Sequence, residues 1–146
     1  MPQDFAKARE LHERAAAKDY VSSMVVLGIL HRAGQGGPVD FNKAREWTEK
    51  AAVRGEDDAM YRLGNLYRDG GPGLSMDFAK AREWYQKAAT KDNIPAMLSL
   101  GRLLEDSKGA HRNCRAALDW YRRAAKNVHF RSSAQARIDV LEKECG

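Results

Sequence analysis

The sequence predicts an all-α solenoid of about eight antiparallel helices. The first observation is a 13-residue segment that recurs as DFAKARELHERAA at 4–16, DFNKAREWTEKAA at 40–52, DFAKAREWYQKAA at 77–89 and, more divergent, NCRAALDWYRRAA at 113–125. The second observation is the spacing, because the four copies begin 36, 37 and 36 residues apart. A fixed period in this range is typical of helical hairpins that stack side by side.

Each copy of the segment has the period of an amphipathic helix. In the third copy, apolar side chains recur at steps of three and four residues, at Phe78, Ala81, Trp84, Tyr85 and Ala88. Charged side chains fill the other face, as expected for a helix with one buried stripe. Every copy opens on Asp or Asn, whose side chains can accept hydrogen bonds from the free amides of the first turn.

Four helices are expected in the first half of the chain, at 4–18, 21–33, 40–52 and about 58–69. Glycine-rich turns, Gly34–Pro38 and Gly70–Gly73, end the second and the fourth. Asp57 or Asp58 can cap the fourth helix. The first helix carries Leu11-His12 where later copies have Trp followed by Thr or Tyr, which suits a terminal helix with one face open to water.

Four more helices are expected in the second half, at about 77–91, 94–106, 113–125 and 132–144. Pro95 suits the first turn of the sixth helix. The even-numbered helices share a Leu-Gly pair, at Leu27-Gly28, Leu63-Gly64 and Leu100-Gly101. Glycine inside a helix costs about 1 kcal/mol relative to alanine. Its recurrence therefore predicts that a neighbouring helix approaches too closely for a side chain.

The alternation of LG-x-LY helices with KA-x-x-W-Y-x-K-A-A helices resembles Sel1-like repeats, which are relatives of tetratricopeptide repeats. The best-matching text is AMYRLGNLYRDGGPGLSMDFAKAREWYQKAA, at 59–89. The resemblance implies a right-handed α/α superhelix in which the first helix of each repeat lines a concave face. It also implies one domain, 1–146, with a half-repeat at 4–18, repeats at about 20–54, 57–91 and 94–127, and a capping helix at about 130–144.

The function that the resemblance implies is a non-enzymatic protein–protein interaction module, of the bacterial adaptor, regulator or toxin-immunity type. A peptide or protein partner would lie on the concave face, where the expected contact residues are Val25, Ile29, Arg32, Tyr61, Asn65, Arg68, Leu98, Arg102, Glu105 and Val140. The apolar members would form a strip with arginines beside it, which is typical of a peptide-binding surface. The alternative is that superhelix curvature buries these residues against each other.

A basic segment gives a second functional hypothesis. Seven Lys or Arg residues and one acid lie between Lys108 and Arg131, in a chain of formal net charge +5. Arg112–Arg131 could therefore bind nucleic acid or an anionic surface. A solvated helix face is the favoured explanation of the charge, because no zinc-finger spacing or glycine-rich RNA-binding signature accompanies it.

No catalytic residue, metal site or cofactor is predicted. The histidines His12, His31, His111 and His129 share no ligand spacing. The tryptophans Trp47, Trp84 and Trp120 recur at one helical position and are expected in the core. Cys114 and Cys145 would open one helix and close the next antiparallel one, so a disulfide is geometrically possible. Free thiols are the default expectation in a reducing compartment.

Features that would carry the chain to or across a membrane are not found in the sequence. The longest apolar run, Met24–Leu30, is far shorter than the roughly 20 residues that span a bilayer. The first residues, MPQDFAKARE, lack the apolar core of a secretory signal. These features favour the cytoplasm, and a periplasmic or secreted location stays open if the start of the chain is trimmed.

Overall fold

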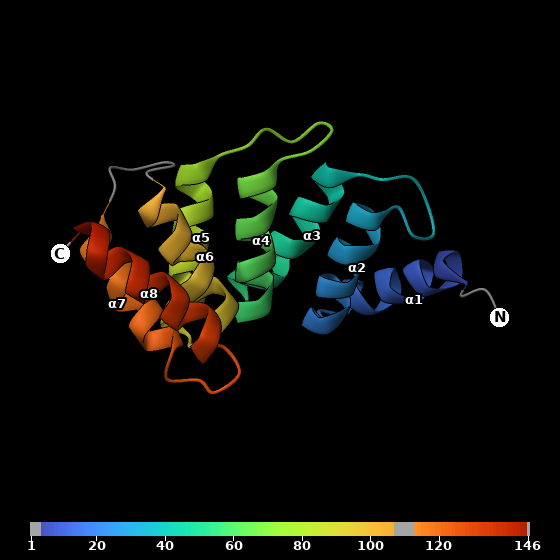
Figure 1. The fold of residues 1–146 in the computed structure, drawn as a ribbon. Helices are drawn as coiled ribbons and strands as arrows, with labels where there is room; N and C mark the ends of the chain where they lie inside the picture. Colours follow the sequence, from blue (N-terminus) through green and yellow to red (C-terminus); the bar gives the residue numbers. More distant parts are fainter. Residues whose placement is uncertain (1–3, 107–112, 146) are drawn as a thin grey trace. The chain divides into compact units, whose positions relative to one another are not determined.

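The computed structural model describes residues 4–106 and 113–145, and this part of the chain forms eight helices and no strand (Figure 1). The helices are α1 (Phe5–Ala17), α2 (Val21–Ala33), α3 (Phe41–Val53), α4 (Asp57–Asp69), α5 (Phe78–Thr90), α6 (Ile94–Glu105), α7 (Cys114–Ala124) and α8 (Arg131–Cys145). Their bounds differ from the expected ones by three residues or fewer. The all-α fold class predicted from the repeat is thus confirmed.

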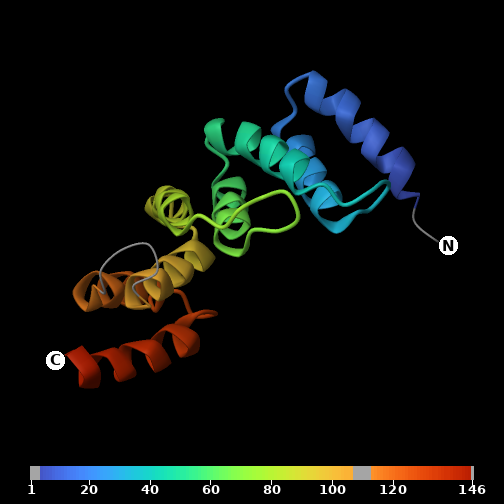
Figure 2. The ribbon, with the colours of Figure 1, turned by 90° about the horizontal axis from the view of Figure 1, so that it is seen from above.

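The chain divides into two compact units. Unit 1 spans Met1–Met76 and holds α1 to α4, and unit 2 spans Asp77–Gly146 and holds α5 to α8. Within each unit every helix packs against the next one along the chain, as Figures 1 and 2 show. Each unit therefore buries its apolar stripes between sequence neighbours, as the repeat predicts.

Each of the four repeated helices is capped by the side chain of the residue that precedes it, as predicted. The carboxylate or amide oxygen of the residue before the helix accepts a hydrogen bond of 2.9 to 3.0 Å from the backbone N–H three residues on. The pairs are Asp4 with Lys7, Asp40 with Lys43, Asp77 with Lys80 and Asn113 with Ala116. A cap of this kind stabilises a helix by about 1 kcal/mol.

The predicted cap of α4 is wrong. The cap position is occupied by Glu56, which makes no side-chain capping hydrogen bond. Asp57 and Asp58 are the first two helical residues, because the helix begins one residue earlier than expected. There both carboxylates interact favourably with the positive end of the helix dipole instead.

The position after each tryptophan, not the tryptophan itself, is the core position. Thr48, Tyr85 and Tyr121 are buried, whereas the three tryptophans are only half-buried. A cation 4.3 to 5.5 Å from the ring centre covers each indole, in the pairs Lys50–Trp47, Lys87–Trp84 and Arg123–Trp120. The prediction that these tryptophans lie in the core is therefore wrong. The helical rotation from one residue to the next points the side chain after each tryptophan, rather than the indole, toward the core.

Two of the repeated glycines lie where a neighbouring helix leaves no room for a side chain. A Cβ built on Gly28 of α2 would lie 2.3 Å from Thr48 Oγ1 of α3. A Cβ built on Gly101 of α6 would lie 2.7 Å from the ring of Tyr121 on α7. Both distances are below contact, so the predicted close approach is confirmed at these two positions.

The two cysteines form a disulfide between the start of α7 and the end of α8. Their Cα atoms are 6.2 Å apart, so the prediction that these helix ends are neighbours is confirmed. The default expectation of two free thiols is wrong for this structure. The antiparallel packing of α7 on α8 brings the two side chains together across 31 residues of sequence.

Candidate functional site

A pocket of about 310 Å³ lies in unit 1, between α2 and α4, with α3 behind them. Its walls are formed by Gly28, Ile29, Arg32, Ala33, Phe41, Thr48, Arg62, Asn65 and Leu66. The pocket exists between α2 and α4 because α3 packs against both helices and holds them apart. It is the best-defined recess that carries residues of the predicted partner-binding set.

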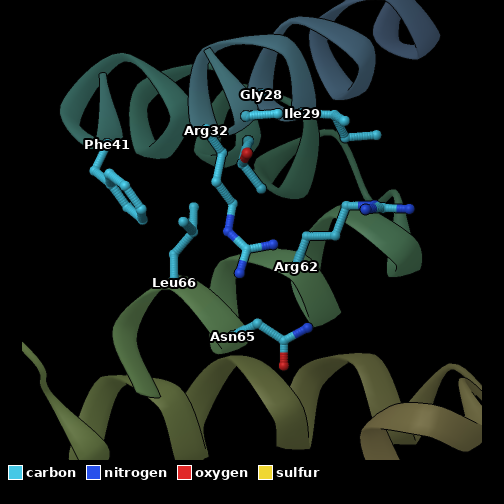
Figure 3. A pocket seen from close by; sticks show the side chains of 9 residues that line it. Gly28, Ile29, Arg32, Phe41, Arg62, Asn65 and Leu66 are labelled. Atoms are coloured by element: carbon cyan, nitrogen blue, oxygen red, sulfur yellow. The ribbon is translucent and has the colours of Figure 1, made fainter. Parts of the chain in front are cut away.

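Apolar and polar side chains take different parts of the pocket (Figure 3). Phe41 and Leu66 point toward each other on one side, and Ile29 lies on the other. Arg32 reaches into the space between them, with Asn65 below it. The pocket therefore offers an apolar wall and a cation at one place.

Arg32 differs from the neighbouring arginines of α4 because it forms no ion pair among the described residues. Arg62 makes an ion pair of 2.7 Å with Asp58, and Arg68 makes one of 2.8 Å with Asp69. The hydrogen bond from Arg68 lowers the pKa of the Asp69 carboxyl, and the charges of Arg68 and Arg32 add to the effect. No carboxylate in the described parts of the chain forms an ion pair with Arg32.

The pocket depends on the small side chain of Thr48. The equivalent position of α7 is Tyr121, whose ring fills the space against Gly101 and α6. In α3 the threonine hydroxyl donates a 2.6 Å hydrogen bond to the carbonyl of Ala44 in its own helix. Threonine in place of tyrosine thus leaves a space that opens between α2 and α4.

Six of the predicted contact residues lie in unit 1. Ile29, Arg32 and Asn65 line the pocket. Val25, Tyr61 and Arg68 lie on the same two helices and are partly exposed. The structure therefore brings three of the ten predicted residues together at one recess.

The remaining predicted residues lie on α6 and α8 in unit 2. Leu98 is partly exposed and Arg102 exposed on α6, and Val140 on α8 is 36% exposed. Glu105, which was expected to face the partner, is buried instead, at 9% exposure.

Glu105 is the centre of a buried polar cluster. Its carboxylate accepts a 3.0 Å hydrogen bond from the Tyr121 hydroxyl on α7 and forms an ion pair with Arg137 on α8. Burial raises the pKa of the Tyr121 phenol to about 12. The expectation for Glu105 is corrected, because α7 and α8 place two donors against it and leave it no role at an open surface.

The basic segment Arg112–Arg131 is partly neutralised by carboxylates from other elements. Lys108, Arg112 and His111 lie outside the described residues. Arg122 pairs with Glu142 at 2.8 Å, and Arg123 pairs with Asp92 at 2.7 Å. Binding of nucleic acid through this segment stays a prediction.

Six residues of the pocket wall were not in the predicted partner-binding set: Gly28, Ala33, Phe41, Thr48, Arg62 and Leu66. One signal for them was present, since Thr48 stands where the third and fourth copies of the repeat have tyrosine. A smaller residue at a core position of a repeat indicates a local cavity unless a neighbour enlarges to fill it.

Within residues 4–106 and 113–145, no three His, Cys, Asp or Glu side chains gather as a set of metal ligands. No helix in these ranges has the length and apolar content needed to cross a membrane.

Comparison with known proteins identifies the repeat. A family model described as Sel1 repeat matches residues 1–20, 21–55, 57–93 and 94–129. The sequence matches none of the curated proteins with which it was compared.

Twenty-three chains of solved structures are similar to this one, among them the following three. A protective antigen of uropathogenic Escherichia coli strains, described as displaying an SLR fold, is 33% identical with a TM-score of 0.81 over 86% of this chain and 27% of that chain. A Sel1 repeat protein of Oxalobacter formigenes is 31% identical with a TM-score of 0.78 over 92% of this chain and 56% of that one. Cysteine rich protein B of Helicobacter pylori shares the fold, at 21% identity and a TM-score of 0.64 over 84% of this chain and 87% of its own.

This chain spans less than two thirds of the length of the first two of these proteins. The similarities confirm the prediction of an all-α solenoid.

Proposed function

Because the chain belongs to the Sel1 repeat family, whose members are generally protein–protein interaction modules, we propose that it captures a peptide or protein partner on the exposed faces of α2 and α4. The mechanism is binding without chemistry, of the kind that a bacterial adaptor, regulator or toxin-immunity protein uses. Arg68 and Tyr61 would extend the contact along α4. A role for Leu98, Arg102 and Val140 of unit 2 in binding a partner stays a prediction.

One observation carries the proposal: an apolar recess and a cation without a carboxylate partner, Arg32, occur together between α2 and α4. Apolar anchors with adjacent arginines are the residues that contribute most to protein interfaces. Ile29 is 37% exposed at the edge of the recess, where a partner would cover it.

An affinity experiment with matched variants tests the proposal. The immobilised chain is used to capture partners from a bacterial lysate, and captured proteins are compared between wild type, Ile29→Glu and Val53→Glu. Val53 is 67% exposed on α3 and does not line the pocket, so its variant introduces the same charge elsewhere.

A partner retained by wild type and Val53→Glu but lost from Ile29→Glu is the expected result. The same protein recovered equally with all three chains would contradict the proposal. Circular dichroism of the variants controls for loss of the helical fold.

A further inference from the structure

We propose that the pocket between α2 and α4 binds the free C-terminal carboxylate of a polypeptide that ends in an apolar residue. The inference rests on the proposed function and names the part of the partner that the recess takes. Arg32 holds the carboxylate, and the apolar wall of Phe41 and Leu66 takes the side chain of the last residue.

The charge of the pocket favours a singly charged anion. Arg62 forms an ion pair with Asp58 and Arg68 forms one with Asp69, whereas Arg32 acts on Asp69 only through its charge and forms no ion pair with a described carboxylate. A carboxylate balances this charge and accepts two parallel hydrogen bonds from a guanidinium. A phosphate group, with a charge near −2, would leave excess negative charge beside Asp58 and Asp69.

The arrangement of apolar and cationic groups favours a chain end over an internal acidic residue. A terminal residue carries its side chain and its carboxylate on one α-carbon, so both enter one recess together. In an extended segment, neighbouring side chains point to opposite faces. An apolar residue followed by Asp or Glu would therefore present only one of its two groups to this pocket.

The size of the recess fits one residue. At about 310 Å³ it lies at the lower end of the range of roughly 300–1,000 Å³ for ligand pockets. Thr48 sets the depth, because its hydroxyl is held by Ala44 and its side chain is smaller than the tyrosine of the next two copies. Gly28 adds no side chain to the wall.

The test is an NMR titration of the full chain, labelled with ¹⁵N, with four probes. The first is the peptide acetyl-Gly-Ser-Gly-Leu with a free terminal carboxylate, and the second is the same peptide with a terminal amide. The third is acetyl-Gly-Ser-Leu-Glu-Gly with a terminal amide, which carries an internal acid only. The fourth is inorganic phosphate.

The free-carboxylate peptide is expected to shift the backbone amides of Gly28, Ile29, Arg32 and Asn65. It should bind at least tenfold more tightly than the other three probes. Arg32→Gln should weaken it at least tenfold, and Thr48→Tyr should abolish it by filling the recess. Arg14→Gln, on the exposed surface of α1, should leave binding unchanged.

Equal binding of the amidated peptide, or no effect of Arg32→Gln, would overturn the inference. Binding of the internal-acid peptide at the same amides would overturn the choice of a chain end and leave the proposed partner surface intact. Equal binding of phosphate would mean a general anion site. If no probe shifts these amides, the C-terminal assignment is wrong, whereas the lysate experiment with Ile29→Glu still decides the proposed function.

Discussion

Thr48 on α3 lies directly against Gly28 on α2, so closely that a Cβ on the glycine would be 2.3 Å from the threonine hydroxyl oxygen. The Thr48 hydroxyl also donates a hydrogen bond to the carbonyl of Ala44, and this bond limits rotation of the threonine side chain. This contact sets the separation of α2 and α3, and so the shape of the pocket that both helices line.

Gly28→Ala is expected to lower the free energy of unfolding. Alanine gains about 1 kcal/mol of helix propensity over glycine. Inserting a methyl group into a packed contact costs typically about 1–3 kcal/mol, and the overlap here places the cost at the upper end. Urea unfolding followed by circular dichroism should show a net loss of about 1–2 kcal/mol.

The control for this prediction is the same change in a Thr48→Ala background. Removing the hydroxyl opens room for the new methyl group, so Gly28→Ala should then be neutral or stabilising. An equal loss in both backgrounds would show that the contact with Thr48 is not the cause.

His31 should make the fold sensitive to mild acid. The ring is 3% exposed, and neither of its nitrogens has a hydrogen-bond partner within 4–106 and 113–145. Burial lowers the pKa of His31 below 6.5, and the charges of Arg9 and Lys43 lower it further, against opposing effects of Asp40 and Glu13.

The unfolded state binds a proton at His31 more readily than the folded state does. The free energy of unfolding is therefore highest above pH 6.5 and falls as the pH drops below that value. The slope reaches up to about 1.4 kcal/mol per pH unit until the folded pKa is passed. Unfolding free energies measured from pH 7.5 to 5 should show this fall, and His31→Leu should reduce it. His129→Gln, at an exposed position, should keep it. A slope unchanged by His31→Leu would assign the effect to another group.

Reduction of the Cys114–Cys145 disulfide should destabilise unit 2. The crosslink closes a loop of 31 residues, for which the chain-entropy estimate is about 3–4 kcal/mol. Denaturant unfolding with and without dithiothreitol measures the difference. The double variant Cys114→Ser, Cys145→Ser should match the reduced protein and should not respond to the reductant. Equal stability of both forms would mean that packing alone holds α8 in place.

The Glu105 cluster should contribute more than the surface ion pairs. Tyr121→Phe removes one donor from a buried carboxylate and should cost about 1–3 kcal/mol. Arg137→Gln should also cost about 1–3 kcal/mol, a value discounted because the arginine side chain is 38% exposed. Arg122→Gln, which breaks the exposed pair with Glu142, should cost less than about 1 kcal/mol. Similar losses for all three variants would contradict the ranking.

The helices could be predicted from the sequence because their ends are encoded locally. Asp4, Asp40, Asp77 and Asn113 each cap the helix that follows, and glycine-rich turns end two of the others. The contact of the repeated glycine with the next helix was predictable for the same reason. Repetition shows it at Gly28 and again at Gly101.

The site was predictable only in part, because it depends on where copies of the repeat differ. Repeat equivalence places Glu105 with Arg32 and Arg68, and the sequence therefore assigned it to the partner surface. In the structure Glu105 is buried, because Tyr121 of α7 and Arg137 of α8 pack against its carboxylate. Arg62 and Phe41 were missed because a pocket wall depends on which side chains are small around it, and the repeat pattern does not show this.

The disulfide between α7 and α8 has a consequence for how this part of the protein unfolds. Proteins open locally at free energies below that of global unfolding, and a helix with few neighbours opens at a low one. The disulfide between Cys114 and Cys145 links the start of α7 to the end of α8, so α8 cannot separate from α7 alone. The two helices are then expected to unfold together or not at all, so a protease that cleaves unfolded segments should not cut α8 while α7 stays folded.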